Sequence, residues 1–256
     1  MGQPVAVRGV GLHTGEVAVV RFHPAEGPVR FWVGGVELRP LASAVVDTSR
    51  CTALGHGALR LFTVEHLLAA LYIRGIWEGL VIEVSGPEVP ILDGSAQEWL
   101  EVLREFPPCG PLPVPLSGAV RVEEGRSSVL ARPDEAFSIS ATILFPHPKI
   151  GYQQVVSPPV PLEELARART FGFLEEVEAL RAQGLIRGAS LENALVFNRY
   201  GYVNTPRMLF EPVYHKALDF LGDLYLAGRP YRGHFVAHRG SHRLHVELAR
   251  LLQVLG

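Results

Sequence analysis

The sequence predicts an α+β protein with two similar halves, each of which packs helices against a sheet. The segment 107–115 carries five prolines in nine residues, so it can continue neither a helix nor a central strand, and we interpret it as a semi-rigid linker. On either side, the chain repeats one order: strands, a helix that carries histidine, a strand and a last helix. This order differs from the strict strand–helix alternation of a parallel sheet. We therefore expect an N-terminal domain over 1–106 and a C-terminal domain over 116–256.

The elements of the first half follow from residue type and from helix start and stop signals. β-Branched and aromatic residues predict strands at 16–22 and 29–33. Thr63 has the residue type of an N-cap and Gly75 that of a helix end, which together predict a helix at 64–74. The apolar run at 79–85 is typical of a buried strand, and a second helix is predicted at 95–105.

The second half repeats the pattern with three strands, two helices, a further strand and a final helix. The first two of these helices are predicted to end at Gly184 and Gly228. The predicted ranges, in chain order, are 118–123, 127–132, 136–145, 174–183, 212–227, 233–237 and 242–255.

Composition and charge exclude several classes of protein. Hydrophobic residues make up 48% of the chain and charged residues 20%, which is typical of a globular protein with a sizeable core. We find no run of about 18 uncharged apolar residues and no signal-peptide pattern, so we expect no transmembrane segment. Cys51 and Cys109 are too few for a disulfide framework, which favours a reducing cytoplasm. The net charge of −2 argues against a nucleic-acid partner.

The predicted helix at 212–227 carries a polar stripe. His215 and Asp219 are four residues apart, so their side chains lie on one helix face, and Asp223 extends the stripe by another turn. Such a pair suits two ligands of one metal ion. The commoner use of such an isolated pair is a hydrogen bond between histidine and aspartate on a solvated face, so the spacing alone is a weak signal for a metal.

A second polar pair stands at the start of the predicted helix at 64–74. Glu65 and His66 point about 100° apart, so they cannot share one task. His66 can join His215 and Asp219 as three ligands that leave one zinc coordination position open for water. Glu65 can then accept a proton from that water, or it can simply complement the positive helix end. The ligand set also suits non-haem iron, and the neighbouring base favours hydrolysis.

Two further segments carry candidate groups. His242 follows a Gly-Ser turn at the start of the last helix, where a carboxylate such as Asp223 can keep it protonated and able to protonate a leaving amine. Thr170 offers a hydroxyl in a loop between basic and aromatic residues. The other histidines of this region are interpreted as ordinary surface or strand residues: His234, His238 and His245.

Six ordered motifs together resemble one enzyme family. They are GVGLHTG at 9–15, TVEHLLAAL at 63–71, GPEVPILDGSA at 86–96, RARTFGF at 167–173, GASLENA at 188–194 and HKALDFLGDLYL at 215–226. The chain is similar, nearly from end to end, to the UDP-3-O-acyl-N-acetylglucosamine deacetylases, the zinc amidases of lipid A biosynthesis. The resemblance implies one Zn²⁺ ion per chain and hydrolysis of the substrate's N-acetyl group, with release of acetate.

The resemblance also implies a role for each matched residue. Glu65 matches the general base, and His242 matches the proton donor with Asp223 as its partner. Thr170 matches the hydroxyl that stabilises the tetrahedral oxyanion. The implied zinc ligands are His66, His215 and Asp219. The implied substrate contacts are Lys216 and Arg239 near the phosphates, Phe145 near the uracil, and Phe171.

The same resemblance implies helices packed between two sheets and a small insert in each domain. One insert, expected within 147–175, would form a hydrophobic passage for the acyl chain, where each buried CH₂ contributes about 0.8 kcal/mol. The chain departs from the family pattern at 77–79, Ala189 and Arg239. These positions bear on substrate fit and not on the metal ligands. We expect a monomer that binds a small UDP-linked amino sugar.

Three other functions are compatible with parts of the sequence. The departures from the family pattern are compatible with deacetylation of a different acetylated amino sugar. A non-catalytic homologue that binds the nucleotide-lipid would need neither Glu65 nor His242, so their presence argues against it. An iron(II) oxygenase usually takes its ligands from an H-x-D pair and a distant histidine, and the candidate ligands do not follow that order.

Overall fold

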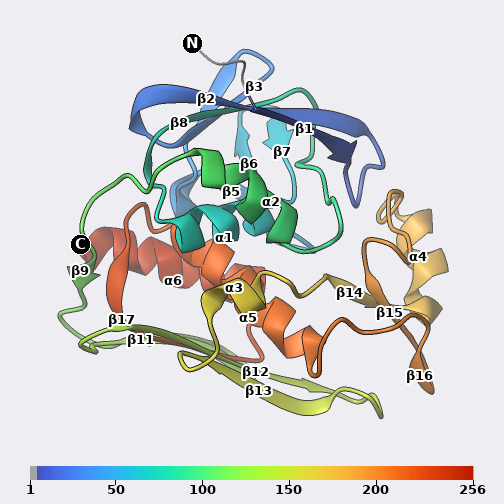
Figure 1. Ribbon diagram of the computed structural model, residues 1–256. Coiled ribbons are helices and arrows are strands. Elements are labelled where there is room, and N and C mark those ends of the chain that lie inside the picture. Colours follow the sequence, from blue (N-terminus) through green and yellow to red (C-terminus); the bar gives the residue numbers. More distant parts are fainter. Residues whose placement is uncertain (1–4, 256) are drawn as a thin grey trace.

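The computed structural model describes residues 5–255 and confirms the α+β class, with helices packed between two sheets (Figure 1). The three longest helices lie between the sheets: α1 (Glu65–Arg74), α5 (Glu211–Tyr225) and α6 (His242–Leu255). Helix α1 packs against α5, and α5 also packs against α6 and against strand β12 (Phe137–Phe145) of the second sheet. The two halves of the chain therefore meet along a helix–helix contact.

The two main sheets share one strand order, in agreement with the prediction of two similar halves. The first runs β1 (Val5–Val10), β2 (Val17–Pro28), β8 (Glu78–Val84), β3 (Arg30–Val33) and β4 (Val36–Leu38). The second runs β10 (Val120–Glu124), β11 (Ser127–Arg132), β17 (Tyr231–His238), β12 and β13 (Gly151–Ser157). In each sheet the last strand inserts between the second and third, antiparallel to the second and parallel to the third.

Buried and more exposed side chains alternate along the strands, so that the buried side chains of each sheet share the face that packs against the helices. In β2, Ala18, Val20 and Phe22 are buried, and the residues between them are less so. Helix α5 is buried almost all round, because it lies between α1 of the first half, α6 and the second sheet. Its polar side chains therefore need partners inside the protein, since an unpaired buried polar group costs free energy.

Each half also carries a small three-stranded sheet, as the resemblance implied. The first contains β5 (Val45–Asp47), β6 (Ala53–His56) and β7 (Leu59–Leu61). The second contains β14 (Phe171–Phe173), β15 (Leu195–Asn198) and β16 (Gly201–Tyr202), with η3 (Leu174–Glu176) and α4 (Val177–Ala182) between its strands. The position expected for this insert, 147–175, is wrong. It spans 171–202, because residues 151–157 form the edge strand β13 of the main sheet.

Other predicted boundaries also change. The helix expected at 95–105 consists of α2 (Gln97–Val102) and the 3-10 turn η2 (Leu103–Glu105), and that expected at 174–183 is divided into η3 and α4. The sequence did not predict strands β1, β4 to β7 and β13 to β16. It also did not predict the short elements η1 (Ala42–Ala44), β9 (Val114–Pro115) and α3 (Leu162–Leu165). Strand β9 pairs with β17, so the end of the proline-rich segment joins the second sheet. Within residues 5–255, no helix has the length and apolar character needed to cross a bilayer.

Candidate active site

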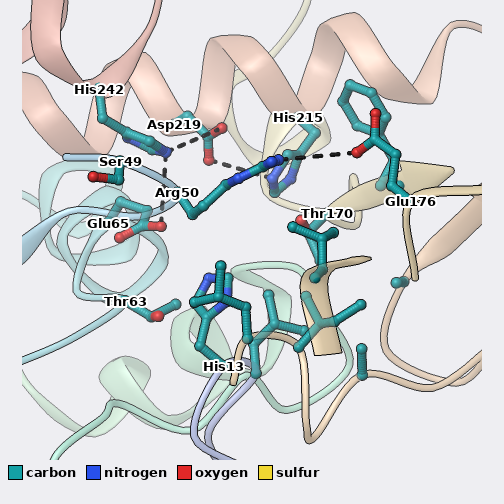
Figure 2. A pocket seen from close by; sticks show the side chains of 18 of the residues that line it. His13, Ser49, Arg50, Thr63, Glu65, Thr170, Glu176, His215, Asp219 and His242 are labelled. Atoms are coloured by element: carbon teal, nitrogen blue, oxygen red, sulfur yellow. Dashed lines mark ion pairs between the residues drawn. The ribbon is translucent and has the colours of Figure 1, made fainter. Parts of the chain in front are cut away.

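Helices α1 and α5 bring together three of the predicted site residues. His66 lies on α1, His215 and Asp219 lie on α5, and all three side chains are buried. Asp219 Oδ1 is 3.6 Å from His66 Nε2 and 3.3 Å from His215 Nε2. Two imidazole nitrogens from different helices thus converge on one carboxylate oxygen, and Figure 2 shows His215 and Asp219 at the wall of the pocket.

Gly222 allows α5 to cross so close to the start of α1. A Cβ atom at this position would lie 2.1 Å from the carbonyl oxygen of Glu65, a backbone atom that cannot move aside cheaply. Any side chain would therefore push α5 away from α1 and separate His215 and Asp219 from His66.

The three side chains suit a divalent cation such as zinc. His215 Nδ1 donates to the carbonyl oxygen of Ala168 at 3.1 Å, which leaves the lone pair of Nε2 for a metal. Burial lowers the pKa of His215 to about 4, so its imidazole is neutral at pH 7. Asp219 Oδ2 accepts a hydrogen bond from Lys216 Nζ at 2.8 Å, whereas the buried Oδ1 has no hydrogen-bond donor among residues 5–255. A cation between the three groups would satisfy this oxygen.

Glu65 lies beside this group and not on a solvated helix end. Its side chain is buried, and its Oε2 accepts a hydrogen bond from the backbone N–H of Thr52 at 3.0 Å. Burial raises the pKa of Glu65, which makes its carboxylate a better proton acceptor. The alternative that Glu65 only complements the helix end does not explain this burial.

His242 faces Glu65 from the start of α6 (Figure 2), with its Nε2 3.9 Å from Glu65 Oε1. Its Nδ1 donates to Asp223 Oδ2 at 2.8 Å. Burial by itself lowers the pKa of His242, but Asp223, Glu65 and Asp219 together raise it to about 9. The imidazole is therefore protonated at pH 7 and can act as an acid.

The interpretation of His245 as an ordinary surface or strand histidine is wrong. Its side chain is buried on α6, one turn beyond His242, and its Nδ1 donates to the same Asp223 Oδ2 at 2.9 Å. Two residues three positions apart on a helix share a face. The spacing between His242 and His245 was therefore the sequence signal that could have placed His245 beside Asp223. His234 and His238 lie on β17, as expected of strand residues.

A cavity of about 400 Å³ opens onto these groups. Its polar end is lined by Glu65, His66, His215, Asp219 and His242, together with Lys216. Its other walls include apolar side chains from the insert at 171–202: Val177, Leu180, Leu185, Ile186, Ala194 and Val196. One cavity is thus lined both by the predicted catalytic and metal-binding residues and by apolar side chains of the insert.

Most of the predicted substrate contacts line this cavity. Phe145 and Phe171 meet edge to face with ring centroids 5.5 Å apart, and both line it. Thr170 also lines it, and its backbone N–H donates to the carbonyl oxygen of Gly94 at 2.7 Å. Arg239 is not among the described residues of the cavity wall. It lies just beyond that wall, and its backbone N–H donates to the carbonyl oxygen of Thr142.

Glu88 organises the segment that brings His13 to the cavity, a role that the sequence did not indicate. Its buried carboxylate accepts hydrogen bonds from the backbone N–H groups of His13 and Thr14 at 3.0 and 2.8 Å. It also accepts bonds from the hydroxyls of Thr14 and Thr63 at 2.8 and 2.7 Å. The expectation that Thr63 caps α1 is therefore wrong: the N-cap residue is Val64, and Glu88 takes the Thr63 hydroxyl.

We expect Glu88→Ala to lower the free energy of unfolding by about 3 kcal/mol, because it leaves several buried donors without an acceptor. Urea denaturation measures the change. The matched control is Glu83→Ala on β8, where the carboxylate is 37% exposed and its ion pairs are solvated. This control should cost less than about 1 kcal/mol, and equal losses in the two variants would contradict the role of Glu88.

Comparison with known proteins identifies the family of this chain. The chain matches the family model of UDP-3-O-acyl N-acetylglycosamine deacetylase over residues 1–253. Three similar curated proteins carry the name UDP-3-O-acyl-N-acetylglucosamine deacetylase. That of Thermosynechococcus vestitus is 45% identical over 95% of this chain and 90% of its own length. That of Leptospira biflexa is 37% identical over 98% and 89%, and that of Haemophilus influenzae 38% over 97% and 87%. This chain belongs to the UDP-3-O-acyl N-acetylglycosamine deacetylase family.

Proposed function

We propose that the protein is a zinc-dependent amidohydrolase that removes the N-acetyl group of UDP-3-O-acyl-N-acetylglucosamine and releases acetate, a step of lipid A biosynthesis. The observation that carries the proposal is the convergence of His66 and His215 on a buried oxygen of Asp219 without a donor among the described residues. Next to these three side chains, His242 Nε2 lies 4.0 Å from Asp219 Oδ2 and 3.9 Å from Glu65 Oε1, which supplies an acid and a base. The names of the similar curated proteins support the substrate.

Each side chain has one task in this reaction. Zinc would be held by His66, His215 and Asp219, and it would supply a Lewis acid able to lower the pKa of water to about 7 and to polarise the acetamide carbonyl. Glu65 accepts the proton of the attacking water, and the Thr170 hydroxyl donates a hydrogen bond to the developing oxyanion. His242 donates its Nε2 proton to the nitrogen as the C–N bond breaks, while Asp223 stabilises the imidazolium. The products are acetate and the free amine.

The lining of the cavity supports a substrate that carries both charge and an acyl chain. Lys216 lines the polar end and brings a positive charge that suits a phosphate, and Phe145 and Phe171 offer aromatic surface. The apolar walls suit an acyl chain, because each CH₂ that they bury contributes about 0.8 kcal/mol. All the proposed reaction groups come from one chain, so a monomer with about one zinc suffices. The free thiols of Cys51 and Cys109 support a location in the reducing cytoplasm.

Acetate release by the purified protein tests this function, with the metal content measured on the same sample. We expect release from UDP-3-O-acyl-N-acetylglucosamine and a much slower reaction with UDP-N-acetylglucosamine, which lacks the acyl chain. Bound zinc without acetate release from either compound would reject the substrate. Tight binding of the deacetylated product without turnover would indicate a non-catalytic binding protein.

Removal of the metal should abolish turnover. We expect a chelator to lower the rate by at least about 100-fold, because the described side chains supply a base and an acid but no Lewis acid. About one equivalent of Zn²⁺ should restore it, whereas Mg²⁺ should not, because two of the proposed ligands are imidazoles and Mg²⁺ prefers oxygen. Undiminished activity in metal-stripped protein would contradict the zinc mechanism.

A further inference from the structure

We propose that Thr52 is a positioning residue that holds the base Glu65 and the acid pair Asp223–His242 in one fixed arrangement. The inference rests on the proposed deacetylase function. Thr52 lies in the segment between β5 and β6, outside every helix that carries a predicted site residue, and its side chain is fully buried.

The backbone of Thr52 is tied to the start of α1 in two ways. Its N–H donates to Glu65 Oε2 at 3.0 Å, and its carbonyl oxygen accepts a bond from the N–H of Val64 at 3.2 Å. The first bond restrains the Glu65 carboxylate from one side, so that Oε1 is the oxygen that faces His242. The peptide of Thr52 thus fixes the position of the base.

The hydroxyl of Thr52 reaches the acid. Its oxygen lies 2.5 Å from Asp223 Oδ1 and 3.2 Å from His242 Nδ1. A carboxylate can only accept, so the hydroxyl proton goes to Asp223, and the oxygen lone pairs are left to face the imidazole. The Nδ1 proton of His242 therefore lies between Asp223 Oδ2 and the Thr52 oxygen, which fixes the plane of the ring.

Removal of the hydroxyl would free the acid pair without touching a reacting group. Asp223 Oδ2 would keep its bonds to His242 and His245, while Oδ1 would become a buried acceptor that has lost its hydroxyl donor. The carboxylate can then rotate to seek another partner and carry the imidazole with it. Because proton donation to the leaving amine needs Nε2 at a defined place, the effect should fall on kcat and not on KM.

Thr52→Val and Thr52→Ser separate the hydroxyl from the rest of the side chain. Valine has nearly the same shape but no hydroxyl, and serine keeps the hydroxyl without the methyl group; both keep the backbone N–H. We expect Thr52→Val to lower kcat for acetate release by about 10- to 100-fold, with KM and zinc content close to those of the wild type. Thr52→Ser should recover most of this loss. Thr52→Ala tests the same hydroxyl if the valine variant does not fold.

A double-mutant cycle distinguishes positioning from general stability. In a His242→Ala background, Thr52→Val should change kcat by less than about twofold, since the group that it positions is already gone. Wild-type kcat in Thr52→Val, an equal loss in Thr52→Ser, or a full loss in the His242→Ala background would each overturn the inference. A wild-type protein that releases no acetate would instead reject the proposed function, and this inference with it.

Discussion

Glu65→Ala should lower kcat for acetate release by about 10³-fold or more while the protein keeps its zinc. A positioned general base contributes about 10²- to 10⁴-fold to proton transfer, and burial raises the pKa of Glu65 toward the range in which a base is most effective. The proposed ligands His66, His215 and Asp219 converge on one another without Glu65. Steady-state kinetics and metal analysis of the same preparation measure both parts of the prediction.

Glu65→Gln is the matched control for this variant. Glutamine keeps the volume of the side chain and can accept the hydrogen bond from the Thr52 backbone through its amide oxygen, but it cannot accept the proton of water. We expect kcat to fall as far as in Glu65→Ala, again with unchanged metal content. Loss of zinc in either variant would make Glu65 a metal ligand and reject its assignment as the base.

The part of the site that the sequence predicts best is the part that one helix determines. His215 and Asp219 share a face of α5 because a helix repeats every 3.6 residues, so their spacing alone brings the two side chains together. His66 lies far from them in sequence and close in space. Only the packing of α1 on α5, made possible by Gly222, places it there, and no local pattern encodes such a contact. Residue type alone allowed His66 to be grouped with His215 and Asp219, and the family resemblance implied the same set, but neither shows the contact itself.

The residues that sequence analysis missed act through tertiary hydrogen bonds. Thr52 precedes a short strand, and nothing near it in the sequence distinguishes it from other threonines, yet it bonds to groups from α1, α5 and α6. Glu88 lies in a turn-rich motif. Its hydrogen-bond donors Thr14 and Thr63 are 74 and 25 residues away in the sequence. The Thr63 hydroxyl donates its hydrogen bond to Glu88, which explains why this threonine does not cap α1 although its residue type favours that role.

The insert boundaries were misplaced for a different reason. Strands of three or four residues, such as β14 and β15, are too short for period-two alternation to be recognised. Residues 151–157 do alternate between buried and exposed positions, as an edge strand of the main sheet should. An insert can be delimited from sequence only when its own elements are long enough to show a period.

His215→Ala should lose both zinc and turnover, in contrast to Glu65→Ala. The variant removes one of three proposed ligands, and the remaining pair, His66 and Asp219, leaves two protein donors where a catalytic zinc site has three. We expect acetate release to fall by at least about 10³-fold and zinc to be lost on dialysis. His234→Ala is the matched control, because His234 lies on β17, bonds to Ser140 and is not among the residues of the cavity wall. It should keep both zinc and activity.

Thermal unfolding gives this prediction a readout that is independent of turnover. A ligand that binds only the folded state stabilises it by about 2.7 kcal/mol at 100 times its Kd, so Zn²⁺ should raise the Tm of the stripped wild-type protein and of Glu65→Ala. The same addition should leave the Tm of His215→Ala unchanged. A zinc-induced rise in Tm for His215→Ala as large as that of the wild type would show that the metal binds elsewhere. The approach of His66 and His215 to Asp219 would then have to be explained by helix packing alone.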